Sequence, residues 1–512
     1  MGGIIGISLA NEYRGDENIG DGYGYHKVMR LVYRHSLGLY GKLYLFFGYV
    51  VGEGVEPVSL LRESSQGVWG SRWTFVAATA GAAVGMGNLW KFSALAGANG
   101  GGAFVLVYLC FVLMVSLPVL IAEVVIGSRG RANPITASHN LAREAGVSTL
   151  WQSMGWLGCL AGLLILSYYS VMAGLGIAHI ESVFSGQYKG LSAAKVGEVF
   201  NQLLADPQQL ALWHSVFIGL VVLVVSTGVE WGMAKMARII LPVFVILLLI
   251  VVFYSNRMGD MAAAQQFLFS FQWQAITPEI MLAALGQAFF TLSIGLGAMM
   301  AFGAYMPDGR SVAGLLSVVV LIDTAVALLA GLAIFPLVFS LNIAPSTGPG
   351  LMFVALPYAF GHIEHGELFG GAFFTVVALV GLSSGVALME PAVAWLVERA
   401  KFKRLFAAIS VGLLVWLLGL AALLSLNVWS DVRWLDRSIF NWLDYVSVTI
   451  LLPLGGLLIA IFVGWRMRLE VVRDEFYRHS GFVFVLWYWL LRYIAAPAVL
   501  VILLVPVYRH WF

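Results

Sequence analysis

Apolar stretches of about 20 residues recur through most of this chain, and no other feature constrains its fold as strongly. An α-helix needs about this length to cross a lipid bilayer, and eleven such stretches can be counted. Only 11% of the residues are charged, whereas a soluble domain carries about a quarter charged residues. The chain is therefore predicted to be an all-α polytopic membrane protein. The predicted spans are approximately residues 72–94, 102–128, 152–184, 211–229, 236–256, 280–306, 311–341, 370–397, 405–427, 440–465 and 482–508.

The basic residues of the loops predict the orientation of these spans. If the segment before the first span is cytoplasmic, the loops on that side hold 14 Lys and Arg and the opposite loops hold five. Cytoplasmic loops are enriched in Lys and Arg. We therefore expect a cytoplasmic N-terminus and, with an odd number of spans, a C-terminus outside. The net charge of +2 does not indicate a nucleic-acid partner, because the basic residues lie in short loops.

Residues 1–65 differ from the rest of the chain. They are rich in Gly, Tyr and charge, and their one apolar run, residues 43–51, is too short to span a bilayer. This run also lacks the long apolar core and the small-residue cleavage site of a signal peptide. We expect a poorly ordered cytoplasmic tail, or translated sequence upstream of the true start, followed by a membrane domain over residues 66–512.

The first span is interrupted by glycines where a membrane helix should be continuous. Gly81, Gly85 and Gly87 lie near its middle, next to Asn88. Glycine loosens a helix, and non-helical backbone at membrane depth occurs where it is buried in protein or lines a cavity. Freed carbonyls can then hold cations and freed amides a carboxylate. The alternative is that the glycines only allow close helix packing.

The sixth span contains a second interruption. Gly295 and Gly297 lie at mid-span beside the hydroxyls of Thr291 and Ser293. Two broken helices five spans apart are typical of transporters built from inverted repeats, whose site lies between the breaks. This pattern predicts a first repeat over 66–256, a second over 280–466 and a peripheral helix over 482–508.

Seven motifs carry a family resemblance between Trp69 and Trp465. In chain order they are WGSRWTF, GAAVGMGNLW, NGGGAFVLVY, GQAFFTLSIGLGA, LLAGLAIFP, GLSSGVALMEP and LPLGG. The ordered set resembles the neurotransmitter:sodium symporter family, and in particular its bacterial amino-acid transporters. The resemblance implies the LeuT fold with a 5+5 inverted repeat, a place in the bacterial inner membrane, and sodium-coupled uptake by alternating access.

The resemblance also implies two sodium sites built from oxygen ligands, which hard cations prefer. The first would use Ala83, Asn88, Thr291 and Asp323, with the substrate carboxylate completing the shell. The second would use Gly81, Val84, Val380, Ser383 and Ser384. On their own, the two serines could instead bond back to their own helix.

Asp323 lies inside a span, where an ionisable side chain is costly and indicates function. Many relatives carry Asn here, and chloride-dependent relatives use a Ser four residues later, where this chain has Ala327. A fixed carboxylate beside sodium could replace the chloride ion, so we expect chloride-independent transport. Proton coupling stays open if Asp323 or Glu123 titrates. Glu123 resembles a glutamate that supports the unwound part of the sixth span in relatives.

By the same resemblance, the substrate is a neutral amino acid. The amides of Met86 and Gly87, at a broken helix end, would bind its carboxylate with the hydroxyl of Tyr169. Monoamine carriers place an Asp where this chain has Gly85. The ammonium group would contact Ala83, Phe290, Thr291 and Ser293. The uncharged side-chain pocket, suited to a hydrophobic or aromatic group, would be Ile165, Tyr169, Phe290, Leu296, Ser384 and Leu388.

Two pairs of residues match the gates of the family. Lys91 and Asp444 stand at the outer gate, and Trp69 and Glu398 at the inner gate. Lys cannot make the bidentate contact of the usual Arg. An alternative function is a sensor that binds an amino acid without moving it. An enzyme is not indicated, because no nucleophile–base pair, phosphate loop or metal-spaced His/Glu motif appears, and no organic cofactor is expected.

Overall fold

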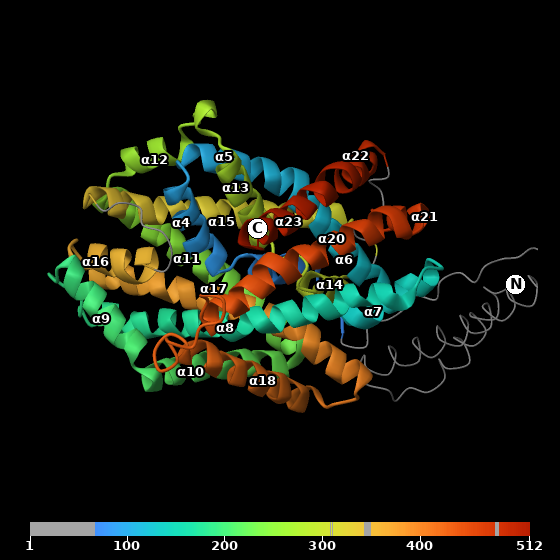
Figure 1. The fold of residues 1–512 in the computed structure, drawn as a ribbon, viewed down its shortest axis with the longest axis horizontal. Helices are drawn as coiled ribbons and strands as arrows, with labels where there is room; N and C mark the ends of the chain where they lie inside the picture. The colour runs from blue at the N-terminus through green and yellow to red at the C-terminus, as the bar shows by residue number, and fades with distance from the viewer. Residues whose placement is uncertain (1–66, 308, 310, 343–349, 477–480, 512) are drawn as a thin grey trace, which may run out of the picture. The chain divides into compact units, whose positions relative to one another are not determined.

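The computed structural model describes residues 67–307, 309, 311–342, 350–476 and 481–511 (Figure 1). These residues belong to one compact unit, Glu63–Phe512. Within the described ranges the regular structure is helical, and no β-strand occurs there. The tail predicted for residues 1–65 lies outside the described residues.

Nine helices in the described part of the chain are long and apolar enough to cross a membrane. Several of them join two numbered helices through a π-helical turn, such as α5 (Gly102–Phe111) and α6 (Leu117–Gly130). The nine candidate spans are Gly102–Gly130, Thr149–Phe184, Pro207–Ser226, Val229–Met258, Val312–Ser340, Gly366–Arg399, Arg404–Leu424, Ile439–Arg466 and Phe482–Tyr508. They match nine of the eleven predicted spans, within a few residues at most ends.

The two remaining predicted spans are the two that glycines interrupt. The first is divided into α3 (Arg72–Ala83), the π-helical turn η2 (Gly87–Lys91) and α4 (Phe92–Ala98). The second is divided into α13 (Pro278–Thr291) and α14 (Ala298–Ala304). Each piece is too short to cross a bilayer alone. The predicted LeuT-like arrangement, with helices 1 and 6 unwound, is therefore confirmed.

The loops contain short helices that were not predicted from the sequence. They are α7 (Pro134–Glu144), α9 (Ala193–Ala205), α12 (Met261–Phe269), α16 (Leu356–Gly361) and α21 (Leu469–Asp474). Their starts follow ordinary capping chemistry. Asn133, for example, accepts a hydrogen bond from the backbone amide of Thr136 at 3.0 Å, and Pro134 begins α7.

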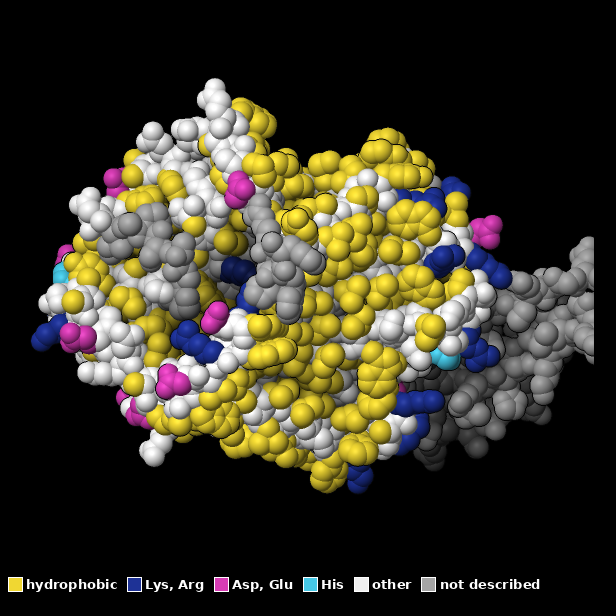
Figure 2. Space-filling view, in the orientation of Figure 1, with side chains coloured by type: hydrophobic (Ala, Val, Ile, Leu, Met, Phe, Trp, Pro, Cys, Tyr) yellow, Lys and Arg dark blue, Asp and Glu magenta, His cyan; other side chains and the backbone are white. Residues whose placement is uncertain are grey.

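Two long helices form the centre of the membrane domain. They are α8 (Ser153–Phe184) and α17 (Gly366–Arg399), which pack against each other along their length. In each of them 72% of the apolar window is buried, against 28% in Val229–Met258 and in Phe482–Tyr508. The first broken helix packs against α17 and α15 (Val312–Ser340). Helix α17 therefore faces the first break, and α8 faces the second, because Gly158 and Gly162 of α8 lie against the backbone of Leu296 and Gly297. The outer helices present hydrophobic side chains at the surface (Figure 2).

Candidate substrate and ion sites

Side chains hold the first break in place. Helix α3 ends at Ala83, and the backbone of Val84 is extended, with φ −65° and ψ 111°. The amide of Gly85 donates to Oδ1 of Asn88 at 2.9 Å, and the hydroxyl of Ser384 donates to the carbonyl of Val84 at 3.1 Å. Groups that an intact helix would pair internally are thus satisfied by two side chains.

Asn88 also joins three transmembrane segments. Its Nδ2 donates to Oγ1 of Thr291 at 3.0 Å and to Oδ1 of Asp323 at 2.8 Å. The Thr291 hydroxyl donates to the other carboxylate oxygen of Asp323 at 3.0 Å. All three side chains are at most 2% exposed. Three of the four residues predicted for the first sodium site are therefore in contact, and Ala83 lines a cavity with Asn88 and Thr291.

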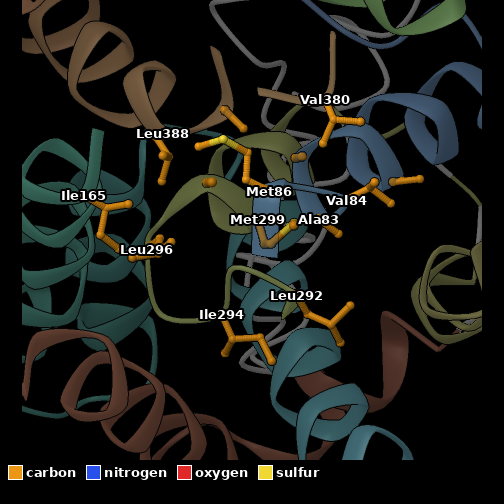
Figure 3. Packing of buried hydrophobic residues seen from close by; sticks show 14 of the residues in the cluster. Ala83, Val84, Met86, Ile165, Leu292, Ile294, Leu296, Met299, Val380 and Leu388 are labelled. Carbon is orange, nitrogen blue, oxygen red and sulfur yellow. The ribbon is translucent and has the colours of Figure 1, made fainter. Parts of the chain in front are cut away.

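The residues predicted for the second sodium site also meet. A Cβ atom added to Gly81 would lie 2.5 Å from Oγ of Ser383, so the glycine lets α3 approach α17 closely. Ser384, the next residue, binds Val84 as described above. Val380 lies one turn earlier on α17, is 1% exposed, and is drawn beside the break in Figure 3.

The second break is supported from neighbouring helices. Residues 292–297 are not helical, and Ser293, Gly295 and Gly297 have φ of 53°, 81° and 73°. On α6, Oε2 of Glu123 accepts from the amide of Gly295 at 2.7 Å, and Oε1 accepts from the amide of Gly297 at 3.1 Å. Glu123 therefore satisfies two backbone amides that the interrupted helix leaves free, as the resemblance implies.

A cavity lies between the two breaks. Ten of the eleven predicted substrate residues line it; the exception is Met86, which is buried next to Gly87. Figure 3 shows Ile165, Leu296 and Leu388 together at one side. The lining residues are Ala83, Gly85, Gly87, Asn88, Ile165, Tyr169, Phe290, Thr291, Ser293, Leu296, Ser384 and Leu388.

Tyr169 adds an unused polar group to this cavity. Its hydroxyl is buried beside Ser384 and the backbone of Met86, and it makes no hydrogen bond of normal geometry among the described residues. A buried hydroxyl without a partner is costly. The orphaned group therefore indicates a ligand that supplies the missing hydrogen bond.

The predicted outer gate has a different geometry from the pair expected. The Nζ atom of Lys91 lies 4.0 Å from the ring centroid of Phe290. Within the described ranges no ion pair joins Lys91 to Asp444. The Lys91 cation thus caps the cavity by stacking on the aromatic ring, an interaction that the residue types alone did not indicate.

The two residues of the predicted inner gate bind different partners. The indole nitrogen of Trp69 donates to the carbonyl of Phe302 at 2.9 Å, and its backbone amide donates to the carbonyl of Tyr305 at 2.8 Å. Glu398 instead accepts from the backbone amide and the side chain of Asn133, at 2.9 and 2.6 Å. Trp69 therefore closes against the end of α14, and Glu398 fixes the start of α7.

A buried acidic residue at this inner end was not predicted from the sequence. Glu390 is fully buried, accepts a hydrogen bond from the Tyr305 hydroxyl at 2.8 Å, and forms an ion pair with Arg404. These contacts link α14 and α17 to α18 (Arg404–Leu424). An acidic residue inside the apolar span 370–397 was the signal that could have revealed it.

Two helices broken at membrane depth, a cavity between them and buried oxygen atoms at both breaks define a secondary transporter. The particular family follows from comparison with known proteins. The chain belongs to the Sodium:neurotransmitter symporter family, which matches residues 66–202 and 188–510.

The chain is similar to several proteins over most of its length. It is 35% identical to the uncharacterized sodium-dependent transporter YhdH of Bacillus subtilis, over 85% of this chain and 96% of that protein. It is 30% identical to an uncharacterized sodium-dependent transporter of Haemophilus influenzae, with the same coverage. A crystal structure of MhsT in complex with L-phenylalanine matches with a TM-score of 0.80 and 36% identity, covering 88% of this chain and 100% of MhsT. The protein is therefore a sodium-dependent membrane transporter and not an enzyme.

Proposed function

We propose that the protein imports a neutral hydrophobic or aromatic amino acid together with sodium, by alternating access. The cavity between the breaks carries this proposal, because polar groups gather at the breaks and Ile165, Leu296 and Leu388 form an apolar side. The similarity to MhsT, which was solved with L-phenylalanine, supports this class of substrate.

The substrate's charged groups would bind at the breaks. Its carboxylate would accept from the amides of Met86 and Gly87 and from the Tyr169 hydroxyl, which makes no hydrogen bond of normal geometry among the described residues. Its ammonium group would donate to the carbonyls of Ala83, Phe290 and Thr291 and to the Ser293 hydroxyl. The side chain would then extend over Ser384 toward the apolar side. No charged side chain lines the cavity, so charged substrates lack a counter-ion there.

Sodium binding would be coupled to substrate binding at the first break. A first sodium ion would be bound by oxygen atoms of Asn88, Thr291 and Asp323 together with the carbonyl of Ala83. The carboxylate of the bound substrate would be a further ligand of this ion. A second ion would bind between the break and α17, at Gly81, Val84, Val380, Ser383 and Ser384. Both sites consist of oxygen donors, which fits a hard cation.

We also infer that transport does not need chloride. Asp323 carries a carboxylate into direct contact with Asn88 and Thr291, and the residue one turn along α15 is the buried Ala327. The carboxylate of Asp323 would therefore supply the negative charge that a chloride ion would otherwise provide next to sodium.

The moving parts would be the two repeats, 66–256 and 280–466, with 482–508 peripheral and the N-terminus cytoplasmic. Lys91 and Asp444 would control the outer entrance to the cavity. Trp69, Glu398 and the missed Glu390 would keep the inner side closed until both sodium ions and substrate are bound.

Proteoliposomes test this function directly. With an inward sodium gradient, labelled L-phenylalanine should accumulate against its own gradient, equally in chloride and in gluconate. Accumulation should be lost when potassium replaces sodium on both sides. Equal uptake in potassium would contradict sodium coupling, and a requirement for chloride would contradict the role of Asp323. Saturable sodium-dependent binding without accumulation would establish a sensor.

A further inference from the structure

Arg492 is a cation inside a candidate membrane span that none of the proposed transport steps uses. It lies in the π-helical turn η10 (Leu491–Ala495), eleven residues into the span Phe482–Tyr508. A charged side chain in a spanning segment is costly, and a partner normally compensates for it.

Two aromatic rings hold the guanidinium group. Its Cζ atom lies 5.0 Å from the ring centroid of Trp465 and 5.0 Å from that of Tyr488. The Tyr488 hydroxyl donates to the carbonyl of Gly464 at 2.8 Å, which fixes that ring. Gly464 also makes room for the arginine, because an added Cβ would lie 3.2 Å from Cγ of Arg492. The position of the cation is therefore built into the fold.

No acceptor for the hydrogen-bond donors of this cation is found among the described residues. The Nε atom is buried and unpaired among the described residues, and no acidic side chain of these ranges lies within ion-pair distance of Arg492. Cation–π contacts stabilise the charge but leave the N–H groups unpaired.

The position of Arg492 in the fold indicates which chemical group accepts its hydrogen bonds. Trp465 is the next-to-last residue of the span Ile439–Arg466, so the ring that holds the cation lies at a helix end, where a long Arg side chain can extend toward the lipid headgroups. The neighbouring Arg466 is exposed. Large apolar side chains around the pair also face outward, with Trp465 at 42%, Trp489 at 50% and Tyr493 at 58% exposure. Lys and Arg gather among hydrophobic side chains at that end in Figure 2.

We propose that Arg492, assisted by Arg466, binds the phosphate group of an anionic phospholipid where η9 (Phe462–Arg466) and η10 meet. The planar guanidinium matches two phosphate oxygens at once, and aromatic rings at headgroup depth commonly accompany such sites. The exposed apolar rim would hold the acyl chains. The apolar rim favours a lipid over free phosphate, because free phosphate has no acyl chains to contact these side chains.

Thermal unfolding of the full-length protein in detergent tests the site, with phosphatidylglycerol or phosphatidylcholine of identical chains added. Phosphatidylglycerol should raise the unfolding temperature at lower concentration than phosphatidylcholine. Arg492→Gln should weaken the apparent affinity for phosphatidylglycerol about fivefold, and Arg492→Lys should weaken it less. Arg143→Gln is the matched control, because it removes an exposed cation from the last turn of α7, an element other than η9 and η10.

Three results would overturn the proposal. They are equal stabilisation by the two lipids, an equal loss in Arg143→Gln and Arg492→Gln, and full stabilisation by inorganic phosphate alone. If Arg492→Gln does not fold, the wild-type preference between the lipids and its reduction in Arg492→Lys decide the question. None of these measurements requires transport, so failure here is separable from failure of the proposed symport.

Discussion

The two broken helices are interrupted in different ways. The first break covers only Val84 and Gly85 and is held by Asn88 and Ser384, which line the cavity. The second covers residues 292–297 and includes three residues in the left-handed region. It is held by Glu123, which lies outside the cavity lining.

This difference implies that ligand binding can change the backbone of the first break, whereas the backbone of the second is fixed by the surrounding protein. In the first break, the side chains that fix the backbone are also proposed ligands, so ion or substrate binding must compete with or reinforce the same hydrogen bonds. In the second, the backbone path is set by contacts that a ligand does not reach. We therefore expect substitutions that disturb the support of the first break to change binding, and substitutions that disturb the support of the second, at Glu123 and the glycines, to change folding.

The largest expected effect is at Gly295, where a methyl group meets two obstacles. The residue has φ of 81°, and an added Cβ would lie 2.5 Å from the carbonyl oxygen of Leu452. The left-handed backbone and the clash together should cost about 2–5 kcal/mol. Gly295→Ala should give little folded protein, measured by the monodisperse fraction in size-exclusion chromatography and by unfolding temperature.

Gly286→Ala is the control for Gly295→Ala. It makes the same change in α13, where an added Cβ meets nothing within 4 Å. It should fold like the wild type. A stable, transporting Gly295→Ala protein would show that the second break adapts, and the distinction between the two breaks would then fail.

Asn88→Ala should affect folding less than Gly295→Ala does, but it should strongly reduce the affinity for sodium. Asn88→Ala removes donors to Thr291 and Asp323 and the acceptor for the Gly85 amide. Leaving such buried groups unpaired costs about 1–3 kcal/mol, so sodium affinity should fall roughly 5- to 150-fold. Sodium-dependent binding of labelled substrate to the detergent-purified protein measures this loss.

Asn99→Ala provides the comparison for Asn88→Ala, because its side chain only caps its own helix through the Leu95 carbonyl, at 2.8 Å. It should leave sodium affinity unchanged. If both substitutions weaken sodium equally, the effect of Asn88 is structural and the first sodium site is misplaced.

Much of the fold could be predicted because a membrane-spanning helix requires a long apolar stretch, which is easily recognised in the sequence. The long apolar stretches and the glycines at two mid-span positions indicate both the number of spans and the two that break. The loop helices leave no such trace. For example, α9 buries only Val196 and Phe200, so neither its length nor its apolar content distinguishes it from a loop.

The cavity could be predicted residue by residue, whereas the contacts at its two ends could not. Residue types at matching positions indicate which side chains line the cavity. They do not indicate that Lys91 stacks on Phe290 instead of pairing with Asp444, or that Glu390 finds its partner Arg404 on the next helix. Such contacts depend on side-chain placement between helices, which the order of residues along one helix does not determine.

The smallest expected effect is at Gly85, the counterpart of Gly295 in the first break. An added Cβ would lie 3.0 Å from Oγ of Ser384, and this hydroxyl can turn away, although it then loses its bond to Val84. One such hydrogen bond contributes about 0.5–1.5 kcal/mol. Gly85→Ala should therefore fold normally and raise the half-saturating sodium or substrate concentration roughly 2- to 12-fold. Gly219→Ala, in the helix Pro207–Ser226 where an added Cβ meets nothing within 4 Å, should leave both unchanged. A Gly85→Ala protein that unfolds as readily as Gly295→Ala would mean that both breaks are rigid, and coupling would then have to arise elsewhere.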